Sequence, residues 1–271
     1  MGSSKTAEPI VPDLEKYLEL RPGLFRCTYV FSLGPLSLPV ATFLIRGHPT
    51  EEGGHEWLMV DAGLPPYAEK VVKSVEAVLT HPKDTLKYIC ITHAHMDHTG
   101  ATLVLLDRWP TAKVIGHPEE KPFLCDGKSF KSCVGDTWVF TIMKHLSGPS
   151  KVQVPESKML FLRENETWEY SGLFEIIETH GHTPGSISFL HVPSKSLMIG
   201  DASKNHMFLK KQPNLSYPLS TGTCHMGTAI KSMDKIISLK ERVDTVFPAH
   251  DYNPEGVTIA DIEHLRTSDP R

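Results

Sequence analysis

A tight cluster of possible metal ligands occupies residues 93–98, which read HAHMDH and bring three imidazoles and one carboxylate into six positions. The cluster follows residues 87–92, a short and nearly apolar run that is typical of a strand buried on both faces. Two histidines that lie two residues apart on an extended chain project to the same side, and Asp97 and His98 then turn toward a neighbouring point. Because a catalytic zinc ion takes about three protein ligands and keeps one position for water, the cluster predicts two adjacent metal ions.

Three further possible ligands, His182, Asp201 and His250, each come shortly after a predicted strand. Strand ends of a common sheet meet at one edge, so these residues can share a pocket with residues 93–98 although they are far apart in the sequence. The chain holds 15 histidines in 271 residues. Because imidazole is the commonest metal ligand, the composition also favours metal chemistry.

Hydrophobic spacing predicts an order of elements that recurs in the second half of the chain. Alternation and β-forming residues predict strands at residues 24–33, 40–46, 56–60, 87–92, 113–115, 159–163, 173–178, 186–192, 197–200 and 245–247. Apolar residues at three- and four-residue spacing predict helices at about residues 67–79, 99–109 and 225–243. Alternation of strands and helices predicts an α/β fold. Residues 118–155 and 204–224 are long irregular connections, which are usually functional in a compact domain.

The composition argues against several classes of protein. A formal net charge of −4 without a Lys/Arg cluster disfavours nucleic-acid binding. The longest apolar runs have four or five residues, far below the ~20 needed to cross a bilayer, and no charged-then-apolar signal segment opens the chain. Five scattered cysteines without a Cys-x-x-Cys pair predict unpaired thiols and a cytoplasmic location.

The length allows one large domain or two small ones. We predict that residues 1–22 are an N-terminal lead, which begins like an added expression leader. Residues 23–271 are predicted to form a single domain.

Taken together, the motifs resemble those of the metallo-β-lactamase-fold hydrolase superfamily. The resemblance rests on HxHxDH at residues 93–98, GHTPG at residues 181–185, the Gly-Asp pair that ends at Asp201 and the Ala-His-Asp that contains His250. Asp61 resembles the aspartate that lies behind the ligands in this family. The resemblance covers residues 24–251, and it implies a four-layer αββα sandwich in which two mixed β-sheets are flanked by helices and carry a dinuclear site at one edge.

The resemblance also implies the ligands and the reaction. Two Zn²⁺ ions are expected, the first held by His93, His95 and His182 and the second by Asp97, His98 and His250, with Asp201 bridging both. A metal-bridging hydroxide would attack an electrophilic centre, and Asp97 would orient it and pass its proton to the leaving group. Intact positions for all seven ligands favour an enzyme over a non-catalytic metal-binding scaffold that acts through partners.

Within the superfamily, residues 200–203 and 249–251 are most similar to quorum-quenching N-acyl homoserine lactonases. This similarity implies a hydrolase that opens a lactone or a related cyclic acyl compound. Those enzymes commonly place a tyrosine three residues after the bridging aspartate, where this chain has Lys204. We therefore expect Lys204 to donate a proton or a hydrogen bond, with Tyr217 entering the pocket from the next loop. A lactam or cyclic carbamate hydrolase and a thioesterase of the glyoxalase II type remain as alternatives.

Further expectations concern the pocket and the other histidines. The partner is expected to be a small cyclic ester or amide, with neither nucleic acid nor membrane involved. An apolar mouth is predicted from Phe123, Leu124, Phe130, Trp138, Phe140, Met207, Phe208 and Tyr217. The Gly-His-Thr-Pro-Gly context favours His182 over His180 as a ligand. His117 is assigned to a surface or loop position, and His206 to a solvated loop.

Overall fold

The computed structural model describes residues 15–33, 36–128, 152–207 and 210–269. Within them, the larger sheet contains seven strands in chain order, β1 to β7. Strands β1 to β4 pair antiparallel and strands β4 to β7 pair parallel, which makes the sheet mixed. Its strands are β1 (Leu18–Arg21), β2 (Leu24–Leu33), β3 (Leu36–Pro49), β4 (His55–Val60), β5 (Thr85–Cys90), β6 (Lys113–Gly116) and β7 (Met159–Phe161).

A second mixed sheet has the strand order β13-β10-β9-β8. Its strands are β8 (Phe174–Glu178), β9 (Ile187–His191), β10 (Ser196–Gly200) and β13 (Thr245–Pro248). Strand β10 pairs antiparallel with β9 and parallel with β13, so β10 and β13 end at the same edge. A separate hairpin, β11 (Lys204–Met207) with β12 (Lys210–Ser216), follows β10 in the chain.

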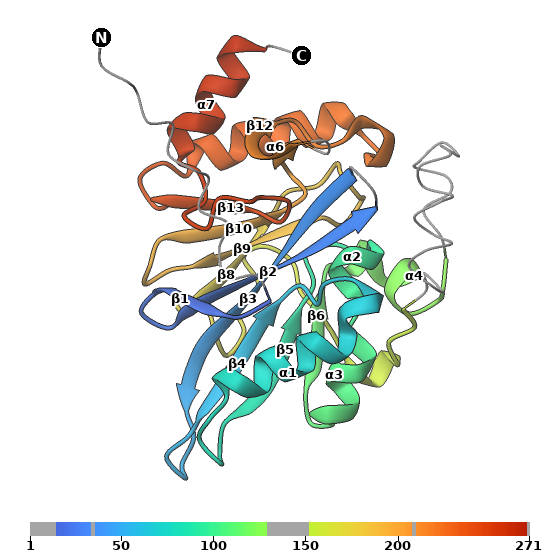
Figure 1. The fold of residues 1–271 in the computed structure, drawn as a ribbon, viewed down its shortest axis with the longest axis vertical. Coiled ribbons are helices and arrows are strands. Elements are labelled where there is room, and N and C mark those ends of the chain that lie inside the picture. The colour runs from blue at the N-terminus through green and yellow to red at the C-terminus, as the bar shows by residue number, and fades with distance from the viewer. Residues whose placement is uncertain (1–14, 34–35, 129–151, 208–209, 270–271) are drawn as a thin grey trace.

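Helices cover the outer face of each sheet (Figure 1). The larger sheet carries α1 (Ala68–Val78), α2 (Met96–Thr99) and α3 (Thr102–Arg108), and the smaller sheet carries α6 (Met226–Ser238) and α7 (Ile259–Ser268). Short helical turns occur at η1 (Pro65–Tyr67), η2 (Pro118–Glu120), α4 (Lys121–Leu124), η4 (Glu156–Lys158) and η5 (Ser220–Gly222). The arrangement is the predicted αββα sandwich, and the fold expectation is confirmed.

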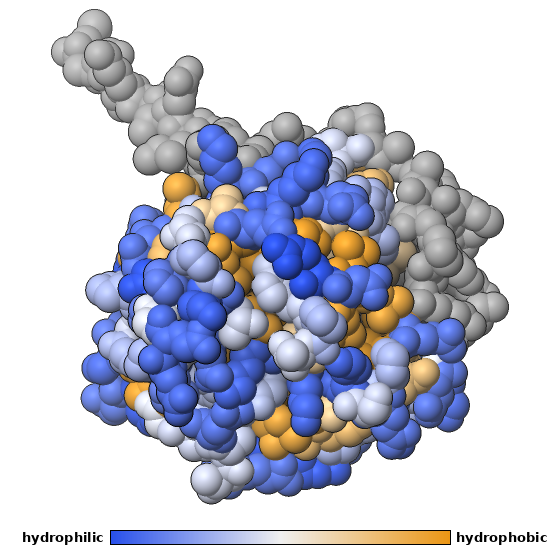
Figure 2. All heavy atoms as spheres, turned by 90° about the horizontal axis from the view of Figure 1, so that it is seen from below, coloured by the Kyte–Doolittle hydropathy of each residue, from blue (hydrophilic) through white to orange (hydrophobic). Residues whose placement is uncertain are grey.

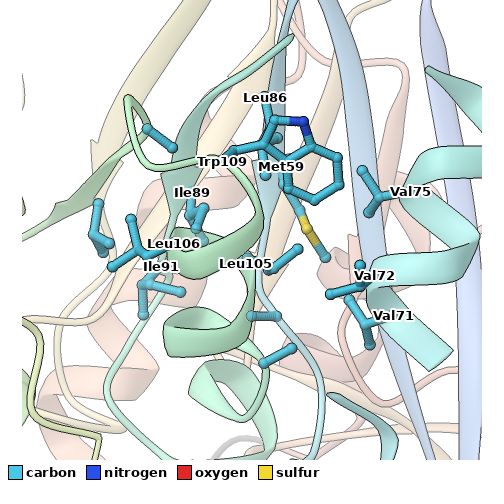
Figure 3. Close-up of a cluster of buried hydrophobic side chains, with 14 of the residues drawn as sticks. Met59, Val71, Val72, Val75, Leu86, Ile89, Ile91, Leu105, Leu106 and Trp109 are labelled. Carbon is cyan, nitrogen blue, oxygen red and sulfur yellow. The ribbon is translucent and has the colours of Figure 1, made fainter. Parts of the chain in front are cut away.

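Three apolar clusters separate the four layers. The first lies between the larger sheet and its helices, where Val71, Val72 and Val75 of α1 face Leu105 of α3 and Met59 (Figure 3). The second lies between the two sheets and includes Phe43, Phe189 and Phe247. The third lies between the smaller sheet and α6 and α7. Burial from both sides explains why β5 has so few polar residues.

Hydrophilic side chains cover most of the face shown in Figure 2, with smaller apolar areas between them. Among the described residues, the large apolar side chains that are exposed are Leu18 and Leu103. None of the helices in the described ranges is long and apolar enough to cross a membrane.

The structure corrects several predicted elements. Strand β1 falls inside residues 1–22, the predicted lead, and pairs with β2, so the folded unit starts before residue 23. The predicted helix over residues 99–109 is shorter in the structure, where α3 covers Thr102–Arg108 and a separate short helix, α2, precedes it. Gly100 lies between the two helices, and its absent Cβ lets the backbone approach Leu64 and Pro65. Helix α7 and the β11–β12 hairpin were missed, and most of the long connection over residues 118–155 lies outside the described residues.

Candidate metal centre

The candidate ligands sit where strands of both sheets end. Residues 93–98 join β5 to α2, and the loop with His182 joins β8 to β9. Asp201 and His250 follow β10 and β13. Gly200 has a φ of +51°, and a Cβ there would lie 2.7 Å from Thr92 Oγ1. A glycine is therefore required for the end of β10 to approach the loop after β5.

Three histidines form what we call the imidazole group: His93, His95 and His182. Nε2 of His93 and Nε2 of His182 each lie 3.0 Å from Nδ1 of His95. Zn–N bonds of 2.0–2.1 Å with tetrahedral angles would separate the ligand atoms by about 3.3 Å. The nitrogens thus stand at nearly the spacing that one zinc ion requires.

Three other side chains form the carboxylate group: Asp97, His98 and His250. Nε2 of His250 lies 3.3 Å from Oδ2 of Asp97, while Nε2 of His98 lies 3.8 Å from the same oxygen. Asp201 lies between the two groups, because its Oδ2 is 3.3 Å from His182 Nε2 and 3.2 Å from His250 Nε2. Its other oxygen is 3.3 Å from His98 Nε2.

Hydrogen bonds on the outer side of the imidazole group assign the ring tautomers. The Thr92 hydroxyl donates to Asp61, so its oxygen accepts from His93 Nδ1 at 3.1 Å. The Thr223 hydroxyl donates to a backbone carbonyl, so its oxygen accepts from His182 Nδ1 at 3.1 Å. Because each neutral ring carries one hydrogen, Nε2 of both histidines is left as a bare lone pair that faces inward.

The carboxylate group is held in the same way. Nδ1 of His98 donates to Oδ2 of Asp61 at 2.7 Å, and Nδ1 of His250 donates to the carbonyl of Pro39 at 2.7 Å. Outer acceptors of this kind orient ligand histidines and leave Nε2 available to a metal. Asp61 itself is 2% exposed, so the aspartate expected behind the ligands lies there.

The pKa values divide the centre into two parts. Burial lowers the pKa of His95 to about 3, and it also lowers the pKa of His93 and His182, so these rings stay neutral. Burial opposes protonation of His250 as well, but Asp201 and Asp97 raise its pKa to about 10. The carboxylate side of the centre therefore requires positive charge, and the imidazole side supplies neutral nitrogen donors. Such a donor set suits a divalent cation such as zinc.

The structure brings all seven predicted ligands together. Of the other two predicted site residues, Lys204 lies near the centre and Tyr217 does not. Lys204 is half-buried on β11, with Nζ 3.4 Å from the carbonyl of His206. Burial lowers the pKa of Lys204, and the charge of Asp201 acts against this shift, so the ammonium lies within reach of the centre's charge.

Tyr217 points away from the centre, contrary to expectation. Its ring packs in the apolar cluster between the smaller sheet and α6 and α7. Its hydroxyl donates to the carbonyl of Asp269 and accepts from Arg266. The expectation that Tyr217 enters the pocket is wrong, because β12 directs the residue toward the C-terminal helix.

Other predicted positions also change. Leu124 is fully buried against the larger sheet, and Phe123 packs beside it, so neither supports an apolar mouth. Phe130, Trp138, Phe140 and Phe208 lie outside the described residues, which also leave the Met207 side chain undescribed. His206 is fully buried beside His250 and does not lie in a solvated loop. Cys224 is disulfide-bonded, against the expectation of unpaired thiols, whereas Cys27, Cys90 and Cys125 are free.

Sequence reasoning missed the residues that hold the loop of His250. Arg26 is buried and donates to the backbone carbonyls of Asp251 and Asn253. The Asn205 side chain donates to Oδ1 of Asp251 at 2.9 Å, and the Asn205 amide donates to the carbonyl of His250 at 2.8 Å. These contacts fasten β11, and with it Lys204, to the loop of a ligand, but no motif marks them in the sequence.

Comparison with known proteins agrees with this geometry. The family model of the metallo-beta-lactamase superfamily matches residues 37–250. The chain is 30% identical to the uncharacterized protein YobT of Bacillus subtilis over 178 residues, which cover 66% of this chain and 68% of the relative. It is 26% identical to the probable metallo-hydrolase YflN of the same organism, with 76% of this chain and 79% of the relative covered.

More distant similarities extend to an enzyme and to a solved structure. The chain is 28% identical to the hydroxyacylglutathione hydrolase GloC of Haemophilus influenzae over 135 residues, which span 49% of this chain and 56% of the relative. The crystal structure of ST1585, an archaeal protein from Sulfolobus tokodaii, superimposes with a TM-score of 0.60 at 22% identity, with 84% of this chain and 79% of that chain covered.

Proposed function

The chain belongs to the metallo-beta-lactamase superfamily, and on that premise we propose that it is a zinc-dependent hydrolase that opens a lactone or a related cyclic acyl compound. The observation that supports metal binding is the convergence of the inward nitrogens of His93, His95 and His182, of which Nε2 of His93 and Nε2 of His182 carry no hydrogen. At most one hydrogen, on His95 Nδ1, can lie among three nitrogens that are 3.0 Å apart in two pairs. One hydrogen cannot point straight at both Nε2 atoms, so a cation among the three nitrogens would stabilise their lone pairs.

The proposed site holds two Zn²⁺ ions. The imidazole group would hold one ion and the carboxylate group the other, with Asp201 within reach of both groups. Bound there, the ions would polarise an acyl carbonyl and lower the pKa of a water molecule toward neutrality. Superfamily membership and the two clusters of possible ligand atoms support this assignment.

Asp97 is the proposed proton carrier. Its side chain and that of Asp201 are each 13% exposed, whereas the ring of His98 is fully buried, so the carboxylates stand on the more open side of the centre. The neighbouring imidazoles of His98 and His250 hold the pKa of Asp97 well below its usual range, although burial acts against them. A carboxylate placed at the reacting edge can accept a proton and deliver it to the leaving alkoxide.

Lys204 is the proposed contact to the substrate. Its ammonium group is half-buried and lies three residues after Asp201, on a strand fastened to the His250 loop. A cation in this place would bind the carbonyl oxygen or the departing oxygen of an ester. Because the leaving group of a lactone stays joined to the acyl part, one ammonium can serve both atoms in turn.

A thioester hydrolase is the second candidate. Its support is the similarity to hydroxyacylglutathione hydrolases, which covers 49% of this chain in GloC and 68% in the Prochlorococcus marinus enzyme at 27% identity. The two-metal chemistry is the same, and the candidates differ in the leaving group, a thiolate or an alkoxide.

A substrate panel tests the proposal. Zinc-loaded protein is assayed against acyl homoserine lactones, plain γ-lactones and a glutathione thioester by acid release, and against γ-lactams and cyclic carbamates by product mass. We expect turnover of a lactone that a chelator abolishes and added zinc restores. Turnover of the thioester alone would replace the proposal by the second candidate. Two bound zinc ions with no turnover across the panel would reject cyclic acyl hydrolysis.

The Lys204→Met variant tests the role of the ammonium. We expect ring opening to slow by more than about tenfold, because a positioned donor contributes a factor of this order or more. Lys231→Met is the matched control, since Lys231 is exposed on α6. Equal rates for Lys204→Met and the parent chain, with zinc content unchanged, would remove Lys204 from the mechanism.

A further inference from the structure

Glu120 is a buried acid that the proposed chemistry does not use. It is the last residue of η2, four residues after β6 ends at Gly116, and it is 1% exposed. Burying a carboxylate in this way is costly unless hydrogen bonds replace the lost water. Burial accordingly raises the pKa of Glu120, while its hydrogen bonds work in the opposite direction.

The three donors to Glu120 come from two loops that carry candidate ligands. The amide of Ala94, between His93 and His95, donates to Oε2 at 2.9 Å. The hydroxyl of Thr183, directly after His182, donates to Oε1 at 2.7 Å, and the amide of Gly185 donates to the same oxygen at 2.8 Å. One carboxylate therefore joins the loop after β5 to the loop after β8.

The packing around Glu120 is built for this contact. A Cβ on Gly185 would lie 2.8 Å from Cγ of Glu120 and 3.0 Å from its Oε1, so the glycine makes room for the carboxylate. The Thr183 loop is also closed on itself, because the amide of Thr183 donates to the Ser186 hydroxyl at 2.9 Å. A closed loop that meets a fixed carboxylate leaves the backbone beside His182 little freedom to move.

We propose that Glu120 is a positioning residue for the imidazole group: it holds Ala94 and Thr183 so that the nitrogens of His93, His95 and His182 converge. The inference rests on the proposed function, because it requires that this group binds a cation. The carboxylate group is oriented by other contacts, from Asp61 to His98 and from Pro39 to His250. The effect of Glu120 is therefore confined to one of the two ions.

The test compares three variants of the full chain. Glu120→Gln keeps the size of the side chain but replaces one acceptor oxygen by an amide nitrogen. This nitrogen cannot accept a hydrogen bond, so the side chain can no longer accept from both loops. Thr183→Val removes one donor and leaves Glu120 in place, and it carries the test if Glu120→Gln does not fold. Glu119→Gln is the matched control, because Glu119 is the exposed neighbour.

Three measurements are made on each variant. Competition with a chromophoric chelator gives the stepwise zinc affinities, the visible spectrum of the Co²⁺-loaded protein reports ligand geometry, and thermal unfolding of the metal-free protein reports general stability. We expect Glu120→Gln to weaken one zinc ion by about 10–100-fold, as contacts behind metal ligands do. The other zinc affinity stays unchanged, and the cobalt spectrum changes. Thr183→Val should weaken the same zinc ion by a smaller factor. The double variant should lose less zinc-binding free energy than the sum of the two single losses.

Two results would contradict the inference, and they are distinct. Parental zinc affinities and a parental cobalt spectrum in Glu120→Gln and in Thr183→Val would overturn the role of Glu120, even if the metal-free proteins unfold at a lower temperature. A parent chain that binds no zinc at all would instead overturn the proposed function, and the positioning role with it.

Discussion

Two clusters of histidines and carboxylates among the described residues contain the same kinds of possible ligand atom but differ in where their ring hydrogens lie. One is the candidate metal centre. The other, which we call the β6–β8 tie, consists of His117, which follows β6, Glu178, which ends β8, and His180. In both parts of the candidate metal centre and in the tie, possible ligand atoms lie within 4.8 Å of one another. Proximity and composition therefore do not separate a metal site from a structural contact.

The position of the ring hydrogen separates them. Nδ1 of His117 accepts from the amide of Glu119 at 3.2 Å, so Nε2 carries the hydrogen and donates it to Glu178 at 3.2 Å. Burial, followed by the neighbouring His180, lowers the pKa of His117, which keeps the ring neutral. A guanidinium nitrogen of Arg163 lies 3.2 Å from the same Nε2. The Nε2 side of His117, where a metal ion would have to bind, therefore already faces the positive charge of Arg163.

In the candidate metal centre the outer partners are acceptors, and in the tie the outer partner of His117 is a donor. An outer acceptor leaves a lone pair inside, whereas an outer donor places a hydrogen there. We infer that the tie fastens β6 to β8 and to the loop that leads to His182. The centre and the tie therefore predict opposite responses to the loss of one imidazole.

The largest effect is expected for His95→Ala. His95 Nδ1 is the nitrogen shared by both close contacts of the imidazole group, so its loss removes a ligand and the convergence together. We expect kcat/KM to fall by more than about 100-fold, beyond what changes behind metal ligands cause. Zinc content, measured by atomic emission, should fall as well. Full turnover with unchanged zinc would refute the ligand assignment.

A much smaller effect is expected for His117→Ala. The variant should keep its zinc and turn over substrate at close to the parental rate. Because Glu178 loses a donor, the free energy of unfolding should fall by about 1–3 kcal/mol, which chemical denaturation measures. If the parent binds a third zinc ion that His117→Ala loses, the tie is a metal site and the tautomer argument is wrong.

The smallest effect concerns His191, whose pKa is shifted by burial without a carboxylate. Burial lowers its pKa from 6.5 to about 4. The folded state thus resists protonation that the unfolded state accepts, so this contribution to stability is complete above pH 6.5 and disappears as the pH falls to about 4. Allowing for solvent screening, its size is about 1–2 kcal/mol.

The measurement compares parent and His191→Gln by chemical denaturation between pH 7 and pH 4. The difference in unfolding free energy should change across this window in favour of the variant as the pH falls. His264→Gln, at an exposed position on α7, is the control. A pH-independent difference for His191→Gln would show that burial does not control this ring.

Much of the fold followed from local pattern. Strand β2 covers the predicted residues 24–33, and β5 was recognisable because both of its faces are buried. Helix α7 was missed because only Ile259 and Ile262 are buried, which gives no apolar stripe. Its Thr258-x-x-Asp261 capping box was the available signal.

The candidate ligands could be recognised in the sequence, because metal coordination constrains residue type and spacing within a few positions. The residues that hold these side chains in place could not be recognised. Glu120, Arg26 and Thr223 act through backbone groups and loops that only the tertiary fold brings together, so no local spacing records their roles. The predicted direction of Tyr217 was wrong for the same reason, since β12 is a polar hairpin strand without clear alternation.

The seven candidate ligand side chains come from both sheets, four from residues 93–98 after β5 and three from the loops of the smaller sheet. A cation bound by both sets would cross-link the two sheets of the sandwich. The sheets could then separate only after the cation dissociates, so zinc should lengthen the lifetime of the folded chain against proteases as well as raise its stability. The proposed metal site would in this way also govern how long the protein persists.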